Sequence, residues 1–96
     1  MGSKNRLQIF TYDITQDSNR RKIARALEEK ATRVQFSVFE ARLTPQATKK
    51  LVKQLSKHLE KGDSLRVYTV GKIGERHCQV IGDGIPVENE TGFWLL

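Results

Sequence analysis

The chain has 96 residues, 38% of them hydrophobic and 29% charged, which fits one small domain over residues 1–96. No apolar run approaches a membrane span, Met1–Arg6 does not resemble a signal peptide, and the lone Cys78 cannot form an intrachain disulfide. We therefore expect a cytoplasmic protein with no membrane partner. The net charge of +6 comes from a basic excess in residues 1–63, which favours a polyanion such as nucleic acid as the partner over a charge that only aids solubility.

The first predicted element is a strand over residues 7–15, built of β-branched and aromatic residues. It is apolar on both alternating faces, one with Leu7, Ile9 and Thr11 and the other with Phe10, Tyr12 and Ile14. A strand apolar on both faces is covered on both. We expect helices on one face and a second copy of the chain on the other, which would bring two copies of Asp13 towards a shared axis.

A helix is predicted from about Asn19 to Ala31, with Asp17 or Ser18 as its N-cap. Its first turn is crowded with cations, which the helix dipole disfavours, and these are Arg20, Arg21 and Lys22. Such a conflict points to a function for these charges, with a solvated basic face as the equal alternative.

The run Arg33–Leu43 is long for one strand in so small a domain, so we divide it near Phe36–Ser37 into a short strand and a longer one. Thr44 followed by Pro45 predicts the start of a second helix, for which Gly62 is a plausible C′ residue.

Clean alternation over residues 63–70 predicts a half-buried strand, and Arg76–Gly82 is expected to form a short edge strand. Asp83–Pro86 is predicted as a turn. The apolar segment Phe93–Leu96 needs a docking place, on its own sheet or on a partner's edge.

The order of elements predicts an α+β fold, the ferredoxin-like βαββαβ arrangement, with both helices on one face of an antiparallel sheet. The core spans about residues 7–70, and the C-terminal extension over 71–96 pairs at a sheet edge or with the partner protomer. The bare face of the sheet, with Tyr12 and Phe10 or their alternates on it, is the expected dimer surface.

Three segments together resemble the CRISPR-associated Cas-two family: Tyr12–Ile14, the basic helix opening Asn19–Ala24, and Arg33–Glu40 ahead of Arg42 and Leu43. The resemblance covers roughly residues 7–70. Members of the family are the small subunits that acquire new spacers together with the larger CRISPR integrase subunit. The resemblance implies a homodimer that binds DNA or RNA in CRISPR adaptation.

The resemblance also implies roles for single residues. Asp13 from both protomers would hold one Mg²⁺ or Mn²⁺ ion per dimer, with Tyr12 beside it in the catalytic site. Arg20 and Arg33 match positions implicated in nucleic-acid contacts, next to Arg21 and Lys22 of the same basic surface. Ser37 and Phe39 lie in the block often placed near the site.

Two functions stay open. In a metal-dependent endonuclease for RNA or double-stranded DNA, Asp13 is essential for cleavage. In a non-catalytic DNA-binding scaffold, the basic residues hold phosphates and Asp13 is dispensable. From the residues alone Asp13 is better interpreted as a turn residue, and Glu40, the nearest candidate base, as a partner for Arg42 or a lysine.

Two alternatives have weaker support. An RNA-binding module of the same fold would need an aromatic block for base stacking, which the sequence lacks. A toxin-type ribonuclease of similar fold has the same topology, although the block Val34–Glu40 argues against it.

Overall fold

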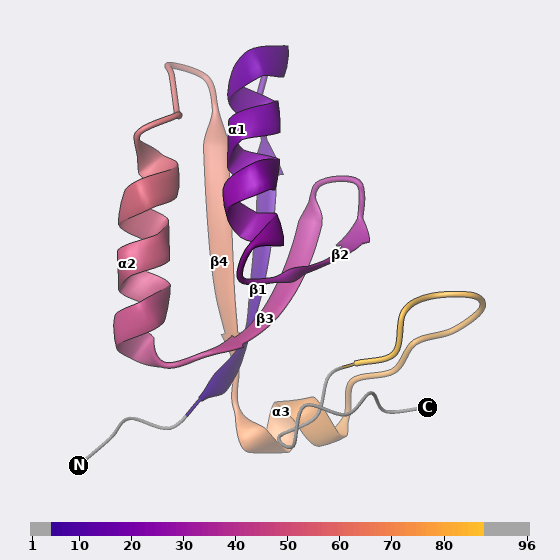
Figure 1. The fold of residues 1–96 in the computed structure, drawn as a ribbon. Coiled ribbons are helices and arrows are strands. Elements are labelled where there is room, and N and C mark those ends of the chain that lie inside the picture. Colours follow the sequence, from indigo (N-terminus) through magenta and orange to yellow (C-terminus); the bar gives the residue numbers. More distant parts are fainter. Residues whose placement is uncertain (1–4, 88–96) are drawn as a thin grey trace.

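The computed structural model of the chain describes residues 5–87 (Figure 1). The elements, in chain order, are β1 (Arg6–Asp13), α1 (Asp17–Glu28), β2 (Thr32–Gln35), β3 (Val38–Leu43), α2 (Pro45–Ser56), β4 (Ser64–Val70) and α3 (Lys72–Arg76). The predicted α+β order of strands and helices is confirmed, with α3 as an addition. The apolar segment Phe93–Leu96, for which docking was predicted, lies outside the described residues.

The four strands form one antiparallel sheet in the order β2-β3-β1-β4, which is the ferredoxin-like arrangement. β1 lies in the middle, where Phe10 pairs with Phe39 of β3 on one side and Val67 of β4 on the other. Both long helices lie over the same face of the sheet (Figure 1). The other face has neither of them, and we call it the open face.

The two sides of β1 therefore meet different surroundings. Phe10 and Tyr12 are buried in the core on the helix side, while Ile9, Thr11 and Asp13 alternate with them on the open face. The bare face was expected to carry either Phe10 and Tyr12 or the residues that alternate with them along the strand. The structure places the alternating residues there. Phe10 and Tyr12 cannot be the dimer surface, because the helices already cover them.

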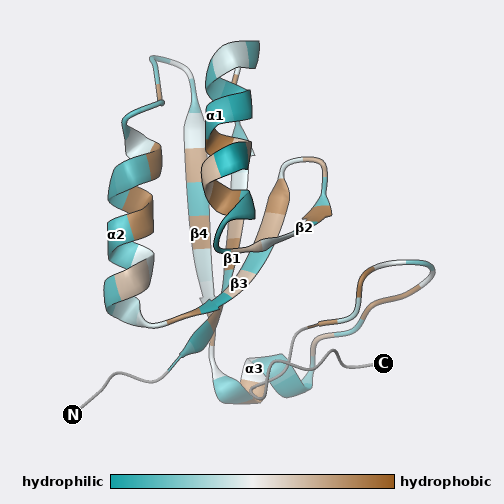
Figure 2. Cartoon of the chain, in the orientation of Figure 1, coloured by the Kyte–Doolittle hydropathy of each residue, from teal (hydrophilic) through white to brown (hydrophobic). Residues whose placement is uncertain are grey.

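The helices supply the other half of the core through apolar stripes. The fully buried members are Ile23 and Leu27 from α1 and Leu55 from α2. Figure 2 shows the apolar residues of α2 on the side turned towards α1 and β4, with polar residues on the other side. Burying a leucine or isoleucine side chain stabilises the fold by about 1.5–3 kcal/mol, so these stripes hold the helices to the sheet.

The first helix begins earlier than predicted. Its N-cap is Gln16, which makes no side-chain capping bond, so the predicted caps Asp17 and Ser18 are wrong. Asp17 instead lies in the first turn and pairs with Arg20 one turn on. This places a carboxylate at the positive end of the helix dipole and reduces the conflict expected from the basic residues.

The second helix begins as predicted. The Thr44 hydroxyl accepts a hydrogen bond from the Ala47 N–H at 3.1 Å, and Pro45 is the first helical residue. The helix ends at Ser56, so Gly62 is not its C′ residue. Gly62 lies in the turn before β4 with φ of +91°, a conformation that glycine adopts without strain.

The predicted break at Phe36–Ser37 is confirmed as the turn between β2 and β3. The edge strand predicted over Arg76–Gly82 is wrong. Lys72–Arg76 is helical, and no strand follows it up to residue 87. Within the part of the chain that the structure describes, no helix is long and apolar enough to cross a membrane.

Candidate functional site

Asp13 ends β1 on the open face of the sheet. It pairs in register with Ser64 at the start of β4, and its side chain is exposed. Alternation along β1 places it in line with Thr11 and Ile9. A carboxylate in this position is free to meet a cation or a second copy of the chain.

Tyr12 does not lie beside the Asp13 carboxylate. It points to the other side of the strand, where it is 5% exposed and its ring packs 6.3 Å from that of Phe39. Its buried hydroxyl has no hydrogen-bond partner among the described residues. The structure thus gives Tyr12 a place in the core, separated from Asp13 by the sheet.

Ser37 and Phe39, the residues predicted near the site, differ in placement. The Tyr12 N–H donates to the Ser37 carbonyl at 3.2 Å, which ties the β2–β3 turn to the strand end that carries Asp13. Phe39 is fully buried on the helix side. Ser37 therefore adjoins the strand end through its backbone, and Phe39 supports the fold beneath it.

Arg20 shapes the loop that follows Asp13. Its guanidinium donates to the Ile14 carbonyl at 2.7 Å and pairs with Asp17, and 30% of the side chain is exposed. Arg21 and Lys22, the next two residues of α1, are exposed. Arg20 is thus partly engaged in structure, while its two neighbours are free to contact a polyanion.

Arg33 stacks on aromatic rings. Its guanidinium carbon lies 5.0 Å from the centroid of the Phe39 ring and 5.7 Å from that of Phe36. Distances of this size allow cation–π attraction. Since Arg33 pairs with Phe39 across β2 and β3, it belongs to the helix side of the sheet.

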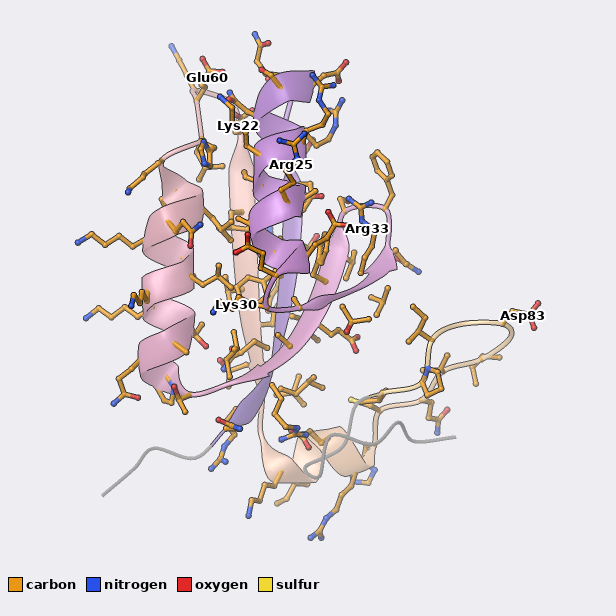
Figure 3. All side chains as sticks on the ribbon, viewed as in Figure 1. Lys22, Arg25, Lys30, Arg33, Glu60 and Asp83 are labelled. Atoms are coloured by element: carbon orange, nitrogen blue, oxygen red, sulfur yellow. The ribbon has the colours of Figure 1, made fainter. Side chains whose placement is uncertain are left out.

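The Asp13 carboxylate therefore lies apart from several of the basic residues. Lys22 and Arg25 lie on α1 and Arg33 on the strand next to it (Figure 3), whereas Asp13 lies on the open face. Within one copy, Arg20 is the exception on α1, because its guanidinium reaches the Ile14 carbonyl next to Asp13. On the open face itself, Arg66 of β4 pairs in register with Thr11. The exposed cations of α1 and the Asp13 carboxylate lie on two sides of the same sheet.

Glu40 lies on the open face of β3, opposite Ile9 of β1 and Thr32 of β2. Partial burial raises the pKa of its carboxyl. Glu40 was expected to pair with Arg42 or a lysine. Arg42 pairs with Glu75 of α3 at 2.5 Å, a contact in which the two side chains are only 7% and 12% exposed.

Glu75 is a residue that the sequence analysis missed. Its second carboxylate oxygen accepts the Leu7 N–H at 3.2 Å, so one side chain fastens α3 to both β1 and β3. The only local signal was an acidic residue shortly after a glycine, which does not specify a partner 33 positions away. Such a contact depends on the tertiary fold.

A groove of about 440 Å³ runs over the open face, between the sheet and the segment that follows α3. Its apolar lining comes from Ile9, Val34 and Val38 of the sheet and from Val80, Ile81 and Ile85 of the segment. Ile81 is 85% exposed. The open face is therefore apolar and only partly covered by its own chain.

The described residues contain no cluster of three or more histidine, cysteine, aspartate or glutamate side chains that could hold a metal ion. Mg²⁺ commonly takes only one or two protein carboxylates and fills its other positions with water and phosphate oxygens. One exposed Asp13 fits half of such a site, and a second copy of the chain would supply the other half.

The chain is similar in sequence to known proteins. The family described as CRISPR associated protein Cas2 matches residues 6–77, a range that includes every helix and strand described above. The CRISPR-associated endoribonuclease Cas2 1 of Chloroflexus aurantiacus is 36% identical over 90 residues, 92% of this chain and 97% of that protein.

Two solved structures share the fold. Streptococcus pyogenes Cas2 aligns with a TM-score of 0.68 and 29% identity, covering 79% of this chain and 99% of that one. A chain of a partial Cas6-RT-Cas1–Cas2 complex aligns with a TM-score of 0.69 and 28% identity, covering 79% of this chain and 84% of that one. The similarity therefore extends from sequence to three-dimensional structure.

Proposed function

Because the chain belongs to the CRISPR-associated protein Cas2 family, we propose that it is a homodimeric nucleic-acid-binding protein of CRISPR adaptation. One observation carries the proposal: the two faces of the sheet differ in chemistry. Both long helices and the exposed cations of α1 lie on one side. The other side carries apolar side chains together with Asp13, Glu40 and Arg66. The open face is suited to a second copy, and the basic side remains available for phosphates.

The dimer would form through the open face. Ile9, Val38 and the half-exposed Tyr68 lie there in adjacent strands, and their burial would remove apolar surface from water. A two-fold axis near the ends of the β1 strands would bring the two Asp13 carboxylates together. Like charges at short range repel, so this arrangement favours a shared cation or proton.

Nucleic acid would bind through its backbone. Two copies double the net charge from +6 to +12, and the basic residues of α1 are joined by Lys49, Lys50, Lys53 and Lys57 of the second helix region. Contacts to phosphates release counterions, so the affinity should fall steeply as salt rises. We infer a scaffold role on this basis, with Arg21, Lys22 and Arg33 among the phosphate contacts.

The partner in adaptation would be the integrase subunit. Support comes from the similarity to a chain of a complex that contains both Cas1 and Cas2. The match spans residues 6–77, so the surfaces offered by all described helices and strands belong to the shared fold.

Phosphodiester hydrolysis is the second candidate function, favoured by the exposed Asp13 and by the endoribonuclease name of the Chloroflexus aurantiacus relative. The two Asp13 carboxylates would hold one Mg²⁺ or Mn²⁺ ion per dimer. Such an ion, when bound, polarises a phosphate and lowers the pKa of a bound water. Arg33 lies on the helix side of the sheet in the same copy, and the Arg20 guanidinium is engaged by the Ile14 carbonyl and Asp17, which favours binding over turnover.

A cleavage assay separates the two functions. Labelled single-stranded RNA and double-stranded DNA are incubated with Mg²⁺, Mn²⁺ or EDTA, and the wild type is compared with Asp13→Asn. Binding of the same substrates is followed by fluorescence anisotropy as salt is raised. Asp83→Asn, a change of one exposed carboxylate on the segment after α3, serves as the control.

On the scaffold proposal, both proteins bind nucleic acid with the same salt dependence and neither cleaves it. Metal-dependent cleavage that disappears in Asp13→Asn would establish the hydrolase instead. If the wild type binds neither substrate at low salt, the nucleic-acid role itself is wrong.

A further inference from the structure

The turn between β2 and β3 carries an exposed aromatic ring. Phe36 is 73% exposed and lies between the exposed Gln35 and the half-buried Ser37. Exposed single apolar residues are common and need no explanation by themselves. What distinguishes Phe36 is the cation beside it.

Arg33 links this exposed ring to the core. Its guanidinium lies near the ring of Phe39, which is fully buried and therefore fixed, and near that of Phe36 at 5.7 Å. Because the buried Phe39 ring holds one face of the Arg33 guanidinium, the N–H groups at the edge of the guanidinium are available to bind an anion. Phe36 and Arg33 thus present one flat apolar surface and one positive charge side by side.

The position of the turn is also fixed. The Ser37 carbonyl accepts the Tyr12 N–H, so the turn is fastened to the central strand of the sheet. α1 contacts β2, and Lys22 and Arg25 on α1 add positive charge on the same side of the molecule (Figure 3). A ring on a fixed turn beside a basic helix has the composition of a nucleic-acid surface, in which cations track the backbone and aromatic rings stack on bases.

We propose that Phe36 stacks on an unpaired base while Arg33 holds an adjacent phosphate. The proposal rests on the nucleic-acid-binding function proposed above and adds a preference to it. In the interior of a duplex, neighbouring bases already cover both faces of each base, so a surface ring finds none to stack on. Away from a duplex end, contact with Phe36 therefore requires a single-stranded segment.

Binding of a labelled single-stranded DNA and of a blunt duplex of the same length tests the proposal by fluorescence anisotropy at fixed salt. Stacking on an aromatic ring contributes about 1–3 kcal/mol per base, so Phe36→Ala should weaken single-strand binding about tenfold. Duplex binding should stay within twofold, and Phe36→Trp should retain single-strand affinity.

Two controls accompany the variants. Ile73→Ala truncates an apolar side chain that is also 73% exposed but lies on α3, and it should leave both affinities unchanged. A 2-aminopurine base in the single strand reports stacking directly, and its fluorescence should change with the wild type and much less with Phe36→Ala. Since Phe36 is exposed, the variant should melt at the wild-type temperature.

The outcomes are distinguishable. If the wild type binds neither DNA, the proposed function fails. If it binds both and Phe36→Ala changes neither affinity, or weakens both equally, the stacking inference is overturned while the proposed function stands. The stacking inference is likewise overturned if Phe36→Ala loses binding to the integrase subunit while its DNA affinity is unchanged. The β2–β3 turn would then contact a protein and not a base.

Discussion

Single residues near the end of β1 connect the loops around the candidate site. The exposed carboxylate of Asp63 accepts the Thr15 N–H and hydroxyl at 3.1 Å each and the Glu60 N–H at 2.9 Å. Asn19 of α1 donates to Glu60 at 2.6 Å. The loop after Asp13 is thus tied to the loop before β4, although neither contains regular structure.

Asp63 should make stability depend on acid pH. Hydrogen bonds from the Glu60 N–H first, and then from Thr15, lower the pKa of this carboxyl. Because the pKa is lower in the folded state, the hydrogen bonds of Asp63 stabilise the fold fully above the ordinary pKa of an aspartate. This stabilisation is lost as pH falls through the pKa of the folded state. Asp63→Asn should therefore be less stable than the wild type at pH 7 in urea unfolding, and the difference should shrink between pH 5 and pH 3.

The control for this prediction is Asp83→Asn, in which an exposed aspartate after α3 is changed. Its free energy of unfolding should follow the wild type throughout the pH series. A difference between Asp63→Asn and the wild type that stays constant down to pH 3 would contradict the assigned cause.

Tyr12→Phe tests whether Tyr12 acts in the core or in catalysis. Its buried hydroxyl lacks a partner among the described residues, and leaving such a group unpaired costs about 1–3 kcal/mol. Removing it should leave the ring packing intact and raise the free energy of unfolding by about 1 kcal/mol. Nucleic-acid binding and any cleavage should not change.

Tyr68→Phe is the matched control, because Tyr68 is 48% exposed and its hydroxyl accepts a hydrogen bond from Arg66. It should be neutral or slightly destabilising in the same denaturant titration. Loss of cleavage in Tyr12→Phe with retained stability would return Tyr12 to the catalytic site.

At the scale of elements, the short helix α3 shows where local sequence stops being informative. Gly71 follows the last residue of β4 and serves as the N-cap of α3 in an extended conformation. No helix was predicted for the residues after it, and a strand was predicted only from Arg76 onward. Their helical turn is held by Glu75, which reaches Arg42 and the Leu7 N–H. Neither partner is near in sequence.

Breaking this contact should be costly. Breaking a buried ion pair by removing one of its members costs about 3–5 kcal/mol. Because the side chains are 7% and 12% exposed, we expect Glu75→Ala to lower the free energy of unfolding by about 3 kcal/mol in a urea titration. The double variant Arg42→Leu/Glu75→Leu should recover much of the loss.

Glu28→Gln, which changes an exposed residue at the end of α1, is the control and should stay close to the wild type. A Glu75→Ala protein as stable as this control would show that α3 is held by its other contacts.

At the scale of the molecule, the elements with strong local signals were predictable. The Thr44–Pro45 start of α2 and the break at Phe36–Ser37 both match, because capping chemistry and strand length are local properties. The sequence did not show which face of β1 the helices cover, because both faces of the strand are apolar. The separation of Asp13 from Arg33 could not be read either, because it follows from the register of β2 on β3.

The open face carries the last prediction. Ile9 lies in its centre, paired with Glu40 on β3 and Tyr68 on β4. Ile9→Arg should place a charge in the proposed dimer surface and give a folded monomer in sedimentation velocity. Lys53→Glu on the outer side of α2 should remain a dimer. A dimeric Ile9→Arg protein, or a monomeric wild type at micromolar concentration, would exclude this interface.

Glu40 adds a pH dependence to the same interface. Burial disfavours the charged form of the Glu40 carboxyl and therefore raises its pKa. A dimer would bury this carboxyl further. Proton uptake should then favour association: the dimer should tighten several-fold as pH falls from neutral towards the raised pKa. Glu40→Gln, which is neutral at every pH, should dimerise more tightly at neutral pH and depend less on pH, with the two Asp13 carboxylates supplying the remaining dependence. Sedimentation equilibrium at pH 7.5, 6 and 5 measures both, and equal pH dependence in the two proteins would place Glu40 outside the contact.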